Sequence, residues 1–83
     1  MIPAAAHLAA EDARRVLRGE LLAEEVSTAA RELAVSWLHR QYLPDVEVGR
    51  RIGLSTYTAA RIRSRLRLPV RRSDLLEVVS RGA

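Results

Sequence analysis

The sequence predicts an all-α protein, a small bundle of four to five helices containing a helix-turn-helix. Alanine, leucine, arginine and glutamate, which favour helices, are abundant. Apolar residues recur at spacings of three and four, and no run alternates with period two for long enough to require a strand. With 83 residues and no cysteine, the chain has the length of one domain with a thin core and no disulfide framework.

The first helix is predicted over about residues 5–18. A narrow apolar stripe runs along it, formed by Ala9, Ala13, Val16 and Leu17. Arginines in its last turn complement the carbonyl end of the helix dipole, and Gly19 offers a stop. A short segment follows, in which apolar side chains anchor the chain and Glu24 and Glu25 face water.

The second helix is predicted from a cap at Ser27 or Thr28 to about Tyr42, before Pro44. Its apolar face has helical spacing and consists of Ala30, Leu33, Ala34, Trp37 and Leu38. Trp37 lies on this face, so we interpret it as a core residue rather than a binding anchor.

Asp45 is the predicted N-cap of a third helix, and Gly53 and Leu54 form the turn after it. A further helix is predicted over residues 55–67, before Pro69. A last short helix could start at Ser73 or Asp74. Residues 66–70 are too short for a β-wing, but one extended strand is an option.

The stretch 45–66 carries the main functional signal. Gly53 suits a tight bend, which usually requires a positive φ, and Gly49 leaves room for the two helices to cross closely. Six residues are predicted to pack inward: Val48, Ile52, Leu54, Ala59, Ile62 and Leu66. The opposite face of helix 55–67 then points outward, as does the face of a helix that enters a DNA major groove.

Residues 45–66 resemble the helix-turn-helix of Cro/repressor-type proteins, in which a small residue, a turn glycine and later aliphatic residues recur. Gly49, Gly53, Leu54 and Ile62 occupy those places, whereas Ala59 replaces the usual isoleucine or valine. The chain from residue 38 to 69 is also similar to DNA-binding segments of small actinobacterial and actinophage regulators. The resemblance implies a sequence-specific transcriptional regulator, such as a phage or prophage repressor or Cro-like protein. Helix 55–67 would occupy an operator and block polymerase.

The charged residues are unevenly distributed along the chain. The net charge is +4, and every basic residue other than histidine is arginine. Residues 1–47 carry a net −3 and residues 48–83 a net +7, which favours a polyanion-binding face in the second half. The predicted base-reading residues are Thr56, Tyr57, Ala60, Arg61, Ser64 and Arg65. The predicted phosphate-binding residues are Arg50, Arg51, Ser55, Arg63, Arg67, Arg71 and Arg72.

Residues 1–83 are interpreted as one DNA-binding domain with its core at 27–69. Residues 1–26 and 70–83 would flank it. A homodimer on a palindrome is the usual way to extend the contact of one helix with DNA. The apolar stripe of the first helix and the residues Leu75, Leu76, Val78 and Val79 are the candidates for that interface. The alternative, equally weighted, is that both surfaces pack on the core, which leaves monomeric binding to an asymmetric site open.

Other classes of function are less favoured by the sequence. No histidine lies in a metal-spaced cluster, no carboxylate pair suits catalysis and no glycine-rich phosphate loop is present. We therefore expect no enzyme activity, cofactor, metal or small-molecule ligand. No apolar run reaches the length of a membrane span, so a cytoplasmic, nucleoid-associated protein is expected. The rival hypotheses are a helical protein-interaction module for an acidic partner and an architectural or excisionase-like DNA factor.

Overall fold

The computed structural model describes residues 4–71, which are helical apart from their connections. No strand occurs among these residues, so the prediction of an all-α fold is confirmed and residues 66–70 form no strand. The helix predicted from Ser73 or Asp74 lies outside the described residues. The elements are α1 (Ala4–Leu17), the 3₁₀ turn η1 (Ala23–Glu25), α2 (Thr28–Arg40), α3 (Asp45–Ile52) and α4 (Thr56–Arg65).

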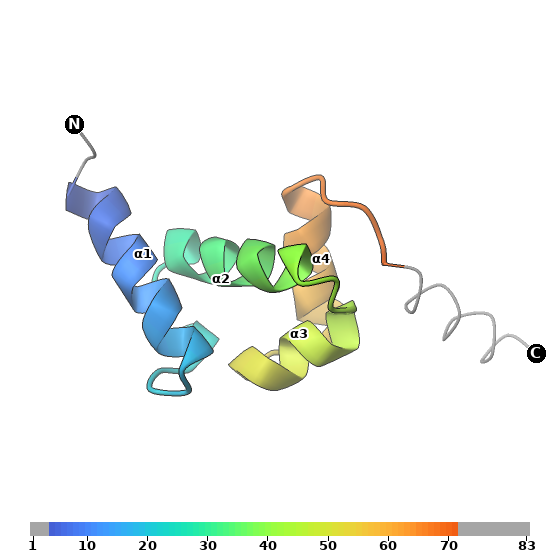
Figure 1. Ribbon diagram of the computed structural model, residues 1–83, viewed down its shortest axis with the longest axis horizontal. Helices are drawn as coiled ribbons and strands as arrows, with labels where there is room; N and C mark the ends of the chain where they lie inside the picture. The colour runs from blue at the N-terminus through green and yellow to red at the C-terminus, as the bar shows by residue number, and fades with distance from the viewer. Residues whose placement is uncertain (1–3, 72–83) are drawn as a thin grey trace, which may run out of the picture.

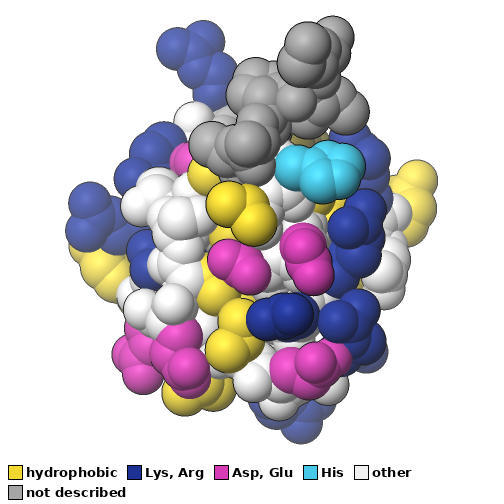
Figure 2. Space-filling model, turned by 90° about the vertical axis from the view of Figure 1, so that its left-hand side faces the viewer, with side chains coloured by type: hydrophobic (Ala, Val, Ile, Leu, Met, Phe, Trp, Pro, Cys, Tyr) yellow, Lys and Arg dark blue, Asp and Glu magenta, His cyan; other side chains and the backbone are white. Residues whose placement is uncertain are grey.

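Helix α2 lies at the centre of the molecule (Figure 1). Helix α1 packs along it at one end, and α3 and α4 pack against each other and against α2 at the other. One core joins these elements and contains Ala13, Val16, Ala23, Ala34, Val35, Leu38, Val48, Ile52, Ala59 and Ile62. The side of the molecule seen in Figure 2 carries acidic, basic and hydrophobic side chains interspersed, rather than one continuous charge.

Helix α1 belongs to this core. Ala9, Ala13 and Val16 are buried, and Leu17 packs at the edge of the core. The stripe therefore lies inside the described fold and is not free to form a dimer interface. The helix ends at Leu17, where the chain turns through Gly19 with a φ of 79°.

Helix α2 begins as predicted, because the Ser27 side chain accepts a hydrogen bond from the Ala30 N–H at 3.2 Å. It ends at Arg40, two residues before the predicted end, because Tyr42 adopts a φ of 63° that a helix cannot continue through. Trp37 is half-buried and packs on the core, as expected, and the Arg14 guanidinium lies 5.9 Å from its ring centroid.

The prediction that Asp45 caps α3 is wrong. Pro44 is the N-cap residue, and Asp45 is the first residue of the helix. Its buried carboxylate accepts hydrogen bonds from Arg63 Nε on α4, with both oxygens at 3.0 Å. Asp45 therefore connects the start of α3 to the middle of α4, and its negative charge suits the N-terminal end of the α3 dipole.

Candidate nucleic-acid interface

The connection between α3 and α4 consists of Gly53, Leu54 and Ser55. Gly53 has a φ of 78°, in the left-handed region that glycine adopts without strain. Its N–H and that of Leu54 both donate to the Gly49 carbonyl oxygen, the latter at 2.8 Å. Ser55 then begins α4, because its Oγ accepts from the Thr58 N–H at 3.1 Å. The predicted turn is confirmed, and Ser55 is the N-cap of the helix that follows it.

Gly49 is buried beside this turn. A Cβ at this position would overlap the Leu54 carbonyl oxygen and lie 3.2 Å from that of Ser55. The close approach that we expected between two helices is therefore an approach of α3 to the backbone of the turn. Because backbone atoms cannot rotate away as a side chain can, only glycine fits without a shift of the turn.

The buried and exposed faces of α4 are those that the sequence predicts. Ala59 and Ile62 are buried, and Leu66 and Leu54 pack at the edge of the core. The six predicted base-reading residues lie on the opposite face, at helical spacing. Ala60 is half-buried, and the exposed members are Thr56, Tyr57, Arg61, Ser64 and Arg65.

Two features of this outward face involve Arg61. Its guanidinium carbon lies 5.8 Å from the ring centroid of Tyr57, which is 71% exposed. A surface hollow of about 300 Å³ is lined by Arg61, Ser64 and Arg65. Within residues 4–71, Arg61 forms no salt bridge, so its donors face this surface uncommitted to an acid.

Arg65 has an acidic neighbour on α2. Its Nε lies 3.9 Å from Glu32 Oε2, and the arginine side chain is 60% exposed. A long, exposed ion pair of this kind contributes little to stability and is easily exchanged for another anion. Arg65 is therefore partly engaged by one of the acids of the first half of the chain.

The two arginines at the end of α3 share one carboxylate. Arg50 and Arg51 both donate to Glu47, with Arg51 Nε at 3.2 Å from Glu47 Oε1. The hydrogen bond from Arg50, followed by that from Arg51, lowers the pKa of Glu47, so this acid remains ionised at neutral pH. Both guanidiniums are exposed, and their positive charge is partly offset by Glu47.

Arg63 does not lie where a phosphate ligand would. Its side chain is 12% exposed, and besides Asp45 it bonds the Leu68 carbonyl oxygen at 2.9 Å. A phosphate contact from Arg63, as predicted from the sequence, would require its guanidinium to leave these partners, which connect α4 to the start of α3. The sequence carries no signal for this pair, whose members are 18 positions apart.

Arg71 is also committed within the protein. It donates to His39 Nδ1 at 2.9 Å and to the His39 carbonyl oxygen, and its guanidinium lies 4.5 Å from the Tyr42 ring centroid. Since Nδ1 accepts, Nε2 carries the proton and donates to the Pro69 carbonyl oxygen at 2.7 Å. His39 is buried. This cluster anchors the chain after α4 to the end of α2, a role the sequence analysis missed.

The remaining predicted phosphate ligands differ in availability. The Ser55 hydroxyl accepts the capping hydrogen bond and donates to Thr58 Oγ1 at 2.9 Å, so its contact with a phosphate would compete with the cap. Arg67 is exposed just after α4, with a φ of 58°. Arg72 lies outside the described residues.

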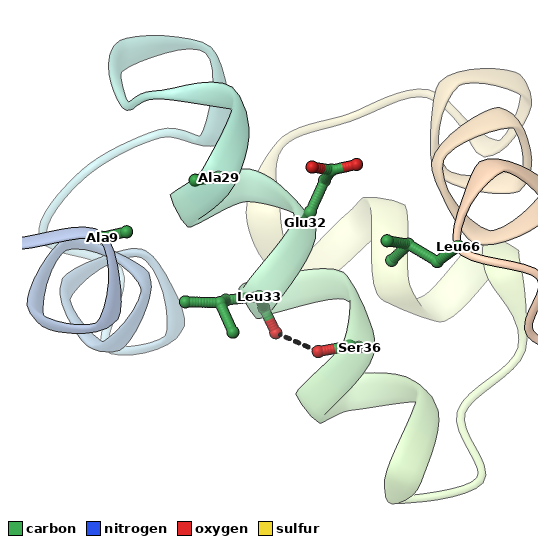
Figure 3. A pocket seen from close by; sticks show the side chains of 6 residues that line it. All are labelled: Ala9, Ala29, Glu32, Leu33, Ser36 and Leu66. Atoms are coloured by element: carbon green, nitrogen blue, oxygen red, sulfur yellow. Dashed lines mark hydrogen bonds between the residues drawn. The ribbon is translucent and has the colours of Figure 1, made fainter. Parts of the chain in front are cut away.

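A second hollow, of about 310 Å³, lies away from the outward face of α4. Helices α1 and α2 and the end of α4 line it, with Leu33 and Leu66 directed toward neighbouring helices (Figure 3). Glu32 supplies the only charged side chain among the lining residues, which are Ala9, Ala29, Glu32, Leu33, Ser36 and Leu66. The hollow is an apolar groove without the groups that acid–base or metal chemistry requires.

No family model, curated protein sequence or solved structure matches this chain. Among residues 4–71, no group of three or more His, Cys, Asp or Glu side chains is arranged to hold a metal ion. No helix in that part of the chain is long and apolar enough to cross a bilayer. The geometry of α3 and α4 therefore carries the functional argument.

Proposed function

We propose that this protein binds double-stranded DNA, with α3 and α4 as a helix-turn-helix and α4 in the major groove. The observation that carries the proposal is the outward face of α4. Five polar or basic side chains are exposed there from its first turn onward, opposite a buried face of Ala59 and Ile62. The turn at Gly53 supports the proposal, because its geometry requires glycine at the two positions where the Cro/repressor-type motif has a small residue and a turn glycine.

The described arginines divide into roles under this proposal. Arg61 would contact a base edge, with Thr56, Tyr57 and Ser64 beside it and Arg65 after release from Glu32. Three exposed arginines would contact phosphates: Arg50, Arg51 and Arg67. Residues 45–71 contain seven arginines and two acids, which favours binding of a polyanion by this part of the chain.

The regulatory role would be steric. A protein that occupies an operator with α4 blocks access of polymerase, and the resemblance to Cro/repressor-type proteins favours a phage or prophage repressor. Control would come from protein concentration and oligomeric state. With the α1 stripe buried in the core, the residues left as candidates for a dimer contact are Leu75, Leu76, Val78 and Val79, outside the described residues. Binding as a monomer to an asymmetric site is the other arrangement.

The proposal is tested by selecting random-sequence DNA duplexes on the purified protein and measuring affinity at several salt concentrations. We expect an enriched motif, and a loss of about 1–3 kcal/mol for Arg61→Ala with relaxed preference at one base position. Arg15→Ala is the control, because Arg15 is an exposed arginine of α1, away from the outward face of α4. No binding at low salt would exclude both a regulator and an architectural DNA factor.

The apolar groove favours a second candidate, a protein-interaction module. Its walls of Leu33 and Leu66 could receive apolar side chains of a partner, with Glu32 and Arg65 at the edge. This candidate predicts that no DNA motif is enriched and that Arg61→Ala does not change binding relative to wild type. An architectural role instead predicts salt-sensitive binding without a motif, together with bending of the duplex.

A further inference from the structure

Tyr57 and Arg61 form a stacked pair on the outward face of α4. They are one helical turn apart, and the guanidinium carbon of Arg61 lies 5.8 Å from the Tyr57 ring centroid. The other two arginines of α4 face acids, Arg63 at Asp45 and Arg65 at Glu32. Within residues 4–71, Arg61 is thus the arginine of α4 that faces an aromatic ring and no acid.

The stack determines how the planar guanidinium of Arg61 meets a base. A free arginine side chain loses rotamer freedom when it binds, whereas a planar guanidinium held at a ring face has already lost part of it. In the major groove, the base edge that matches a planar fork is guanine, through O6 and N7. The pair therefore favours guanine opposite Arg61.

Tyr57 carries its own recognition element beside that guanine. It lies in the first turn of α4 and is 71% exposed, so its aromatic ring is accessible for apolar contact. The apolar group in the major groove is the C5-methyl of thymine. Neighbouring bases on one strand are about 3.4 Å apart along the duplex axis, and the 5.8 Å separation of ring and guanidinium accommodates that rise with a lateral offset.

We infer that Tyr57 and Arg61 act as one reading unit for a thymine next to a guanine, with Tyr57 against the methyl group and Arg61 on guanine O6 and N7. The inference rests on the proposed DNA-binding function and specifies the base step that α4 reads. Tyr57 also acts as a positioning residue for Arg61, since the ring that meets thymine is the surface on which the guanidinium lies.

The test uses the full-length protein and the duplex enriched from the random library. In one version of that duplex, uracil replaces the thymine of the step, which removes only the methyl group. In another version, 7-deazaguanine replaces the guanine, which removes N7. For wild-type protein we expect uracil to weaken binding about three- to fourfold, the cost of one exposed methyl. We expect 7-deazaguanine to weaken binding about tenfold, the lower range for a bidentate contact.

Variants assign each loss to a residue. Tyr57→Ala should bind uracil and thymine equally and reduce the preference of Arg61 for guanine about two- to fivefold, the strength of an exposed cation–π contact. Tyr57→Phe should retain the methyl dependence, because the ring and not the hydroxyl contacts the base. Arg61→Ala should bind both purines equally. Tyr42→Phe is the matched control, since Tyr42 is the other exposed tyrosine stacked on an arginine, away from α4.

The outcomes separate the inference from the proposed function. A duplex motif without adjacent thymine and guanine, or unchanged affinity with uracil and 7-deazaguanine, overturns the inference while DNA binding stands. A loss of methyl dependence in Tyr57→Phe overturns the assignment to the ring. Absence of any DNA binding overturns both proposals.

Discussion

At the scale of single residues, the pair between Asp45 and Arg63 connects two helices through a nearly buried ion pair. Both side chains are nearly buried, at 10% and 12% exposure, and Arg63 donates to both carboxylate oxygens. Removal of water from two charges is costly, and this cost is recovered only while both partners remain. The pair connects the start of α3 to the middle of α4, and so contributes to the direction of the outward face of α4.

We therefore predict that Arg63→Met lowers the free energy of unfolding by about 3 kcal/mol, because it removes one charge of a buried ion pair and keeps the other. Chemical denaturation followed by Trp37 fluorescence measures the change. Arg61→Met is the control and should leave stability within about 0.5 kcal/mol of wild type, as expected for an exposed position. If Arg63→Met were as stable as Arg61→Met, and had lost DNA affinity instead, Arg63 would be a phosphate ligand after all.

At the scale of elements, the turn between α3 and α4 is constrained by two glycines. Gly53 needs its positive φ, and Gly49 has no space for a Cβ beside the Leu54 carbonyl oxygen. Alanine normally stabilises the interior of a helix by about 1 kcal/mol relative to glycine. At Gly49 the steric overlap reverses that sign.

We predict that Gly49→Ala destabilises the protein by about 1–3 kcal/mol, the cost of forcing extra atoms into a packed site. It should also weaken DNA binding at temperatures where the variant is folded, because the turn must move and α4 with it. Gly19→Ala is the comparison: it has a φ of 79° but no atom within 4 Å of an added Cβ. Its cost should stay near 1 kcal/mol and DNA affinity should not change. Thermal unfolding and gel shift measure both, and a stabilised Gly49→Ala variant would contradict the steric explanation.

The elements themselves could be predicted from local rules. Periodicity placed four helices to within two residues, and the caps at Ser27 and Ser55 and the turn at Gly53 follow from side-chain chemistry close in sequence. The errors concern contacts between distant residues. Asp45 has the composition of an N-cap, but its partner lies on α4, and Arg71 resembles a phosphate ligand until His39 and Tyr42 are brought beside it. A count of arginines along the sequence therefore does not show which guanidiniums are engaged within the protein, as those of Arg63 and Arg71 are.

At the scale of the whole molecule, carboxylates lie beside several arginines of the basic region and partly offset their positive charge. Glu47 lies between Arg50 and Arg51, and Glu32 lies near Arg65. A carboxylate beside a cationic surface opposes the approach of DNA and competes with phosphate for the same guanidiniums. Because its two arginines lower the pKa of Glu47, mild acid does not remove this competition.

We predict that Glu47→Gln binds DNA roughly two- to fivefold more tightly at low salt, the range for loss of one exposed charge interaction. The slope of log K against log salt concentration should become steeper by up to about one, since one more phosphate can be neutralised. A salt titration by fluorescence anisotropy measures both. Glu11→Gln, which removes the acid paired with Arg15 on α1, should change neither. Equal effects from the two variants would place the DNA elsewhere.

Half of the twelve buried hydrophobic residues in the described chain are alanines: Ala9, Ala13, Ala23, Ala30, Ala34 and Ala59. Helices joined by such small side chains approach closely but remove little apolar area from water. The heat-capacity change on unfolding scales with that area. The stability curve of this protein should therefore be shallow, so that its free energy of unfolding varies little between cold and warm growth conditions. A thin core thus makes fold stability, and with it the arrangement of α3 and α4, relatively insensitive to temperature.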